Sequence, residues 1–407
     1  MKRPEMLALL LAASPVCAQL SPTVTLEELL RFVARSPRIV ASEREADAAR
    51  AERLIAGALP NPNLSLGRSR PSGGERTIFD AGSQQQATVE LPIPVFGQRG
   101  ARVRAADLQV GRAESQLRLT ESETRRLAAL GFVRLLAAQE QLEARRAALA
   151  DVERIRGLVA GRLESGMASR YDLARAEAEL ALAGLGVQRA ETDLNEHGAA
   201  LAALADAPGW RPRAAGSLQS LQASYPEAAS PEAPLERSPA ARVARDESAA
   251  AEARIEVAQR ERLPVPSVAL GRTWTSGPFG AANFVGLASE IPILDNKRGL
   301  EDKARADAAA ARERERATKA TLLAEYGRQR EVLRVRRAAL ERFEKEVFQR
   351  QSAFMEMAET AYRLGRGTLF ELLDARRTQV EALAARLELV AAILEAQIEL
   401  RALTGDL

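Results

Sequence analysis

The sequence repeats itself at a spacing of about 200 residues, and this duplication limits the possible folds more than any other feature. Residues 59–68, LPNPNLSLGR, return as residues 263–272, LPVPSVALGR. Residues 99–100 match residues 298–299, and from there the offset stays at 199 residues to the end of the chain. Isolated matches are weak evidence, but one constant offset over about a hundred residues does not arise by chance. The chain therefore consists of two units of one architecture.

Proline placement divides each unit into two parts. No proline lies between residues 94 and 208, and none follows residue 292. Because a proline inside a helix costs about 3 kcal/mol, these two tracts are free to form long helices. Glycines near the middle of each tract, Gly166 in one and Gly365 in the other, predict a reversal of the chain. We expect helical hairpins at residues 98–206 and 298–404.

Apolar residues recur every seven positions in both tracts, which is typical of helices packed along their lengths in a left-handed supercoil. In the first tract they are Leu135, Leu142 and Leu149. In the second tract they are Tyr326, Leu333, Leu340, Val347, Phe354 and Ala361. The helix before the first reversal, from about Gly100 to Gly161, would measure roughly 90 Å. A helix of that length needs partner helices along all of it, which favours a tube over a globular domain.

Upstream of each helical tract the apolar period changes from seven to two. Val268, Leu270 and Trp274 alternate with small or polar residues, and the first unit carries a weaker version of the same pattern. We expect strands at residues 63–69, 84–92, 266–275 and 283–291. An apolar face opposite a small or polar face is the pattern of a barrel wall.

Four strands cannot close a barrel and would leave two unpaired edges. Three chains would supply twelve strands, so we expect a trimer with a 12-stranded β-barrel continued by a tube of helical hairpins. The fold class is thus mainly α with β. The first unit spans residues 19–207 and the second residues 240–407, with a Pro-rich linker at residues 208–239.

The first 18 residues have the features of a secretory signal peptide. Lys2 and Arg3 precede an apolar run at residues 6–13, and Val16 and Ala18 occupy the −3 and −1 positions of a cleavage site. The alternative is a lipoprotein with Cys17 lipidated, and we favour ordinary cleavage because the residues before Cys17 do not fit a lipidation site. No other stretch has the ~18 consecutive apolar residues of a membrane helix. We therefore expect an exported chain that reaches a membrane only as a β-barrel.

Composition and motifs argue against other functional classes. The 58 basic and 55 acidic side chains are interleaved, which indicates solvated helix faces rather than a nucleic-acid surface. No catalytic or phosphate-binding motif is present, so we expect neither an enzyme nor a cofactor. His197 is the only histidine, and Met355 and Met357 are two residues apart, on different helix faces. We therefore expect no metal site.

The duplicated strand-and-hairpin units, the signal peptide and the sequences at the two reversals resemble the TolC family of outer-membrane efflux factors. The resemblance covers residue 25 onward, and residues 90–102, ELPIPVFGQRGAR, are similar to the heavy-metal (CzcC-like) branch. It implies a passive homotrimeric duct in the outer membrane that extends into the periplasm. Such a duct docks on a periplasmic adaptor, which contacts an inner-membrane pump, here of the RND type. The implied substrates are heavy-metal cations, with drugs or other small molecules as the alternative.

The resemblance also implies roles for residues at the hairpin tips. The adaptor-docking residues are Arg162, Leu163, Gly166, Arg363, Leu364, Gly365 and Gly367. The family's periplasmic constriction carries over to Glu371 and Asp374, with Asp172 as the first-unit equivalent of Glu371 and Arg175 as that of Asp374. Three chains would place six carboxylates around one opening, which would favour cations and raise some of the carboxyl pKa values. The alternative is that both are ordinary carboxylates at a helix N-terminus, stabilised by the helix dipole.

Two other classes of protein are weighed against the channel. A periplasmic adaptor carries one coiled-coil hairpin flanked by split β-domains, whereas this chain has two hairpins at equal spacing. A structural coiled-coil protein would leave the four strand segments and their turns unexplained. Both are less consistent with the duplication.

Overall fold

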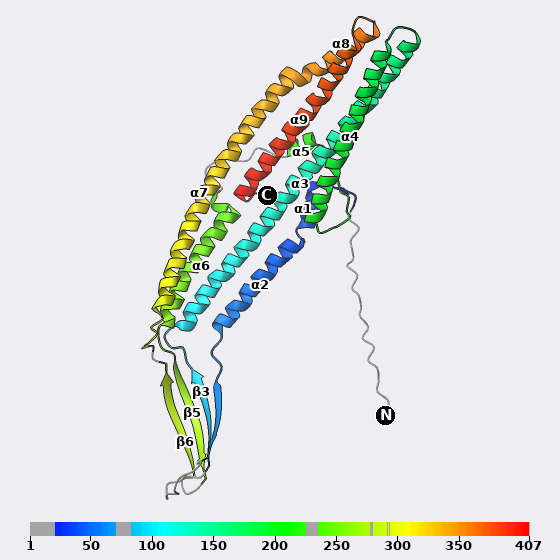
Figure 1. The fold of residues 1–407 in the computed structure, drawn as a ribbon. Coiled ribbons are helices and arrows are strands. Elements are labelled where there is room, and N and C mark those ends of the chain that lie inside the picture. The colour runs from blue at the N-terminus through cyan, green and yellow to red at the C-terminus, as the bar shows by residue number, and fades with distance from the viewer. Residues whose placement is uncertain are drawn as a thin grey trace, which may run out of the picture. The chain divides into compact units, whose positions relative to one another are not determined.

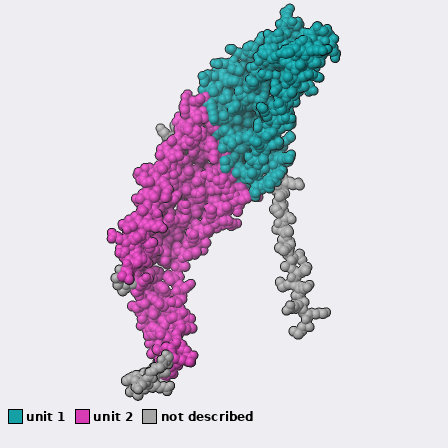
Figure 2. Space-filling view, in the orientation of Figure 1, with its two compact units in different colours: residues 1–33, 127–226, 336–395 teal, residues 34–126, 227–335, 396–407 magenta. Residues whose placement is uncertain are grey.

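The computed structural model describes residues 21–70, 83–224, 235–276, 280–290, 292 and 294–406. The expected signal peptide, Cys17 included, lies outside the described residues. The chain forms two compact units, which are distinguished by colour in Figure 2. Unit 1 takes the described parts of residues 1–33, 127–226 and 336–395, and unit 2 those of residues 34–126, 227–335 and 396–407.

Long helices dominate the fold, because the proline-free tracts are rich in alanine, leucine, arginine and glutamate. The first hairpin consists of α3 (Gln98–Glu164) and α4 (Arg170–Leu204). The second consists of α7 (Arg298–Phe343), a π-helical turn (Glu344–Phe348), α8 (Gln349–Arg363) and α9 (Leu369–Thr404) (Figure 1). None of the described helices combines the length and apolar character needed to cross a membrane.

The seven-residue stripe of the second tract is interrupted. Leu333 and Leu340 are buried, but Val347 and Phe354 are 38% and 57% exposed. The π-helical turn begins after Leu340 and contains Val347, and its extra residue changes the angular phase of the side chains from there on. The expectation of one continuous stripe to Ala361 is therefore wrong beyond Leu340. In the first tract Leu135 and Leu142 are buried and Leu149 is half-buried.

A four-stranded antiparallel sheet in unit 2 joins strands from both repeats. The order is β2 (Asn63–Ser69), β3 (Gln84–Pro92), β5 (Pro266–Thr275) and β6 (Ala281–Ser289). The bounds of β2, β3 and β5 are those read from the alternation, and β6 lies two residues earlier than expected. In Figure 1 the sheet lies beyond the C-terminal ends of α2 and α6 and the N-terminal ends of α3 and α7.

The register places the apolar strand residues in common rows on one face. One row runs across all four strands through Leu64, Val89, Leu270 and Val285. A second row joins Leu91, Val268 and Leu287. The opposite face carries serine, threonine, glutamine, glycine and alanine at most positions. The two faces therefore differ in polarity across the whole sheet.

Three helices upstream of the strands were not anticipated. They are α1 (Leu26–Val33), α2 (Pro37–Gly57) and α6 (Pro239–Glu261). Both α2 and α6 begin directly after a buried serine, with proline at the first helical position, where its missing N–H is harmless. The recurring Ser-Pro pairs at residues 36–37 and 238–239 are the sequence signal that identifies these helix starts.

Part of the expected linker folds onto the first hairpin. Strand β4 (Arg213–Ala214) pairs in parallel with β1 (Thr23–Val24), and α5 (Leu218–Ser224) follows. The side chain of Gln139 on α3 binds the backbone of Ala214 twice, accepting from its N–H at 2.7 Å and donating to its carbonyl at 3.1 Å. Glu140 accepts the N–H of Leu218 at 2.6 Å. These bonds fix the segment to the middle of α3. Residues 225–234 of the linker lie outside the described residues.

Candidate docking tips and constriction

The two hairpin tips are built by the same backbone turn. Gly166 and Gly365 have φ angles of +73° and +72°, a left-handed conformation that favours glycine. The N–H of Met167 donates to the carbonyl of Arg162 at 2.7 Å, and that of Arg366 to the carbonyl of Ala361 at 2.9 Å. Equivalent residues of the two repeats therefore make the same backbone hydrogen bond at the two tips.

A close backbone approach fixes the second tip further. A Cβ atom at Gly367 would lie 3.0 Å from the Cβ of Ala361, so the turn has no room for a larger residue. Only a glycine at position 367 allows the turn to pack this closely against Ala361, so Gly367 helps to set the shape of the turn.

Arg162, an expected docking residue, binds the other tip within the same chain. Its guanidinium donates to the carbonyl of Tyr362 at 2.8 Å and lies 4.6 Å from the centroid of the Tyr362 ring. Leu163 is half-buried, and Arg363 is exposed and paired with Glu359 at 2.8 Å. The most exposed apolar side chains of the tips are Met167 (67%), Tyr171 (69%), Leu364 (64%) and Phe370 (55%). Three of these four were missed by the sequence reasoning.

Further arginines connect the two hairpins below the tips. Arg376 on α9 forms an ion pair with Asp151 on α3, and its side chain is only 13% exposed. Arg377 pairs with Glu179 on α4 at 2.7 Å. Arg175 lies 4.8 Å from the Phe370 ring centroid and donates to the hydroxyl of Tyr171 at 3.3 Å. The buried apolar cluster between these contacts consists of Ile155, Val159, Ala176, Tyr362, Leu369, Leu372 and Leu373.

Two of the three expected constriction carboxylates close capping boxes. Glu371 accepts the backbone N–H of Thr368 at 2.8 Å, and the hydroxyl of Thr368 accepts the N–H of Glu371 at 3.2 Å. Asp172 accepts the N–H of Ser169 at 2.9 Å, and the Ser169 hydroxyl accepts the N–H of Asp172 at 3.1 Å. Hydrogen bonds from the Ser169 hydroxyl and backbone hold the pKa of the Asp172 carboxyl below its usual range. Glu371 thus has the helix-terminal role that was the alternative interpretation for it and Asp374, and Asp172 has the same role at the first tip.

Asp374 differs from the other two. It is exposed, and its carboxylate has no hydrogen bond or ion pair with any of the residues that the structure describes. Its first-unit equivalent, Arg175, bridges to Phe370 instead. The two repeats therefore differ in charge at this position, and among the described residues Asp374 is the expected constriction residue whose carboxylate has no partner.

The run at residues 90–102 forms a corner between the sheet and the helices. The buried amide of Gln98 accepts the N–H of Phe96 at 3.0 Å and donates to the carbonyl of Pro264 at 3.4 Å. Arg99 donates to the carbonyl of Gly57, the last residue of α2, at 2.7 Å. Gln98 and Arg99 thus link the chain segments that enter and leave the strands.

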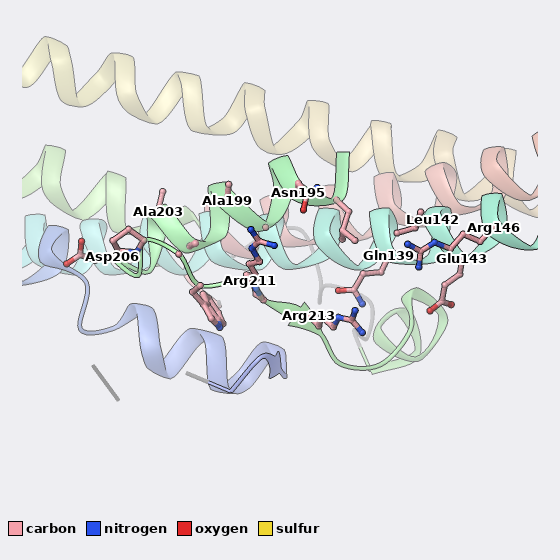
Figure 3. A pocket seen from close by; sticks show the side chains of 17 residues that line it. Gln139, Leu142, Glu143, Arg146, Asn195, Ala199, Ala203, Asp206, Arg211 and Arg213 are labelled. Carbon is pink, nitrogen blue, oxygen red and sulfur yellow. The ribbon is translucent and has the colours of Figure 1, made fainter. Parts of the chain in front are cut away.

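A hollow of about 910 Å³ lies beside the first hairpin. Figure 3 shows Gln139, Leu142, Glu143 and Arg146 on α3 facing Asn195, Ala199 and Ala203 on α4, with Arg211 and Arg213 beside them. Arg146 is paired with Glu191 at 2.6 Å. The lining has no nucleophile paired with a base, and it gives no basis for catalysis.

The described residues contain no group of three or more His, Cys, Asp and Glu side chains that could hold a metal ion. His197 is half-buried on α4. Met355 packs against the cluster between the hairpins, whereas Met357 is 59% exposed, so the two methionines lie on different faces.

The duplicated units, the two-faced sheet and the joined tips define a duct-forming transport protein rather than an enzyme. The chain belongs to the outer membrane efflux protein family, whose model matches residues 31–206 and 231–406. It is therefore an outer-membrane efflux channel protein that extends into the periplasm. The two matched segments correspond to the two repeats.

Several characterised proteins are similar to this chain. The cobalt-zinc-cadmium resistance protein CzcC of Cupriavidus metallidurans is 26% identical over 361 residues, which is 88% of this chain and 84% of that protein. The crystal structure of the channel protein CusC has a TM-score of 0.80 at 17% identity, covering 93% of this chain and 91% of CusC. VceC of Vibrio cholerae has a TM-score of 0.76 at 18% identity, covering 93% and 96%. The solved structures establish the shared fold.

Proposed function

We propose that this chain is the outer-membrane subunit of a tripartite efflux system and that three copies form one continuous duct. The observation that carries the proposal is the sheet, which has two free edge strands and an exposed apolar face. Leu66, Val285 and Leu287 on that face are 75%, 77% and 84% exposed in the single chain. Three such sheets would pair edge to edge, remove the edges and turn the apolar face to lipid.

The hairpins would continue the barrel as a tube that ends at the tips. The exposed apolar residues Met167 and Leu364 flank the turn glycines and offer a contact surface for a periplasmic adaptor. Arg363, Gly365 and Gly367 complete this surface on the second hairpin. The adaptor would connect the duct to an inner-membrane pump of the RND type, and the duct itself is passive.

Heavy-metal cations are the proposed substrates. The similarity to CzcC supports this choice, and drugs or other small molecules remain the second candidate. The chain needs no resident metal ligand for this role, because a duct conducts ions without holding them tightly.

The constriction is proposed to be a ring of Asp374 and Glu371 side chains from three chains, with Asp172 near it. Asp374 would carry most of the electrostatic effect because its carboxylate has no partner among the described residues, whereas Glu371 and Asp172 also cap helices. A ring of carboxylates attracts cations and repels anions.

The test is to extract the full-length protein from outer membranes and reconstitute it in planar bilayers. We expect a detergent-extracted trimer that forms cation-selective channels. Asp374→Asn combined with Glu371→Gln should raise the single-channel conductance and weaken the cation selectivity. Glutamine still accepts the Thr368 N–H, so this variant removes charge and keeps the cap. A water-soluble monomer would contradict the duct, and unchanged conductance and selectivity would contradict the acidic ring.

A further inference from the structure

Two arginines and a tryptophan interrupt the apolar face of the sheet at the end farthest from the helices. We call Arg68, Arg272 and Trp274 the arginine belt. Arg272 and Trp274 lie two and four residues beyond Leu270 on β5, and so on the same face. In the strand register Arg68 on β2 lies opposite Gln85 on β3, and Gln85 lies opposite Trp274 on β5. Arg68 is therefore on the same apolar face as Arg272 and Trp274.

Charge is segregated between the two faces of the described strands. Arg68 and Arg272 are the basic residues of the four strands, and both are on the apolar face. The acidic residue of these strands, Glu90, is on the polar face and accepts a hydrogen bond from Ser267. No carboxylate among the residues that the structure describes pairs with either arginine of the belt. Among the described residues the belt therefore has no acidic partner, and its two positive charges favour an anionic partner.

The position of the belt along the strands indicates where that partner lies. A guanidinium on a lipid-facing strand is costly at the middle of the bilayer and nearly neutral at its surface. Leu270 and Leu66 lie two residues closer to the helices than the belt, and they are 54% and 75% exposed. Trp274 is 42% exposed, and the Arg272 guanidinium lies 5.5 Å from its ring centroid. An aromatic residue at this level is typical of the membrane–water interface.

We propose that the arginine belt binds the phosphate groups of phosphorylated lipids in the outer leaflet of the outer membrane, with the acyl chains on the neighbouring leucines. The inference rests on the proposed barrel, which turns the apolar face to lipid. Guanidinium groups bind phosphate oxygens through two parallel N–H bonds, and they are less strongly hydrated than ammonium groups. Contact between the ring face of Trp274 and Arg272 leaves the N–H edge of the guanidinium available for that purpose.

The experiment measures lipid binding to the full-length protein in neutral detergent by native mass spectrometry. The probes are bisphosphorylated lipid A, the same lipid after removal of both phosphates, and inorganic phosphate. The variant is Arg68→Gln with Arg272→Gln. The control is Arg189→Gln with Arg350→Gln, which removes the same charge from exposed positions on α4 and α8.

We expect the belt variant to bind phosphorylated lipid A at least tenfold more weakly, while the control binds it as the unchanged protein does. The dephosphorylated lipid should bind all three proteins equally and weakly. Binding of the phosphorylated lipid to the unchanged protein should fall at least fivefold between 0.05 and 0.5 M ammonium acetate, which tests the inference even if the variant does not fold. Equal binding by variant and control, no preference for phosphate, or displacement of the lipid by millimolar inorganic phosphate would overturn the inference.

Channel recordings on the same preparations separate this inference from the proposed function. Unchanged protein that forms channels but binds both lipids equally would overturn only the arginine belt. Protein that forms no channels in any bilayer would overturn the proposed duct.

Discussion

Arg162 of the first hairpin caps the end of helix α8 in the second hairpin by donating to the carbonyl of Tyr362 at 2.8 Å. The same guanidinium lies 4.6 Å from the centre of the Tyr362 ring. One side chain thus adds a second hydrogen bond to a helix-terminal carbonyl, which also accepts the Gly365 N–H at 3.0 Å, and packs on the aromatic ring of the same residue. This contact joins the two tips into one surface, so the proposed adaptor would meet both hairpins together.

Replacing Arg162 by alanine should separate the tips. The loss of one charge-assisted hydrogen bond predicts a decrease of about 1.5–3 kcal/mol in the free energy of unfolding. Amide hydrogen exchange should accelerate at the residues around both tip turns, which locates the effect. The matched control is Arg363→Ala, whose exposed pair with Glu359 predicts a change of about 0.5 kcal/mol or less. Equal effects of the two substitutions would contradict the assignment.

Replacing Asp151 by alanine should destabilise the protein more than removing both members of its ion pair. The Arg376 side chain is 13% exposed, so the single substitution leaves a nearly buried guanidinium without its carboxylate. We expect a loss of about 2–3 kcal/mol on chemical denaturation. Asp151→Leu combined with Arg376→Met should recover most of that loss, because two apolar side chains replace two desolvated charges. A double variant as unstable as the single one would contradict this account.

The first tip should loosen in acid. The pKa of the Asp172 carboxyl is lowered in the folded state by its hydrogen bonds with Ser169, so the ionised carboxylate stabilises the folded turn. That contribution is fully present above the ordinary value of 3.8 and is lost as the pH falls below it toward the folded-state pKa. Amide exchange around residues 166–172, corrected for its intrinsic pH dependence, should show falling protection from pH 5 to pH 3. Asp172→Asn should show no such change over this range.

Asp206 and Gly405 offer a reciprocal test of the repeat. They occupy equivalent positions after α4 and α9, with φ angles of +51° and +77°. Asp206→Gly should stabilise the protein by about 0.5–1 kcal/mol, because glycine adopts this conformation without strain. Gly405→Asp should destabilise it by about 1–3 kcal/mol, since a Cβ there would also lie 3.1 Å from the carbonyl oxygen of Arg237. Thermal unfolding of both variants gives the comparison, and shifts of the same sign would contradict the equivalence.

Gly271 is expected to keep the proposed lumen open. The Phe284 ring covers Gly271 on the polar face, and a Cβ atom at position 271 would overlap the ring. Gly271→Ala should push the ring away from the sheet and lower the single-channel conductance. The repeat-equivalent Gly67 has nothing within 4 Å of its Cβ position, so Gly67→Ala is a matched control that should leave conductance unchanged. Adding Phe284→Ala to Gly271→Ala should restore conductance, and failure to do so would contradict the mechanism.

Local sequence was sufficient to predict the strands and the reversals. Alternating apolar residues specify a strand that has one apolar face, and glycines at a left-handed turn specify where a hairpin reverses. These signals depend on a few neighbouring residues, so they can be read from one chain. The same local reasoning overlooked α2 and α6, whose Ser-Pro starts are weaker signals than a long proline-free tract.

The contacts between hairpins could be found only in the tertiary structure. No spacing in the sequence indicates that Arg162 reaches Tyr362 or that Arg376 reaches Asp151, because these partners are more than 190 residues apart. The π-helical turn likewise broke a heptad stripe that the sequence presents as continuous. The sequence by itself determined a duplicated chain of strand pairs and helical hairpins. The tertiary structure decided which arginines join the hairpins, and it left the Asp374 carboxylate without a partner among the described residues. Both outcomes depend on where long side chains meet across separate helices.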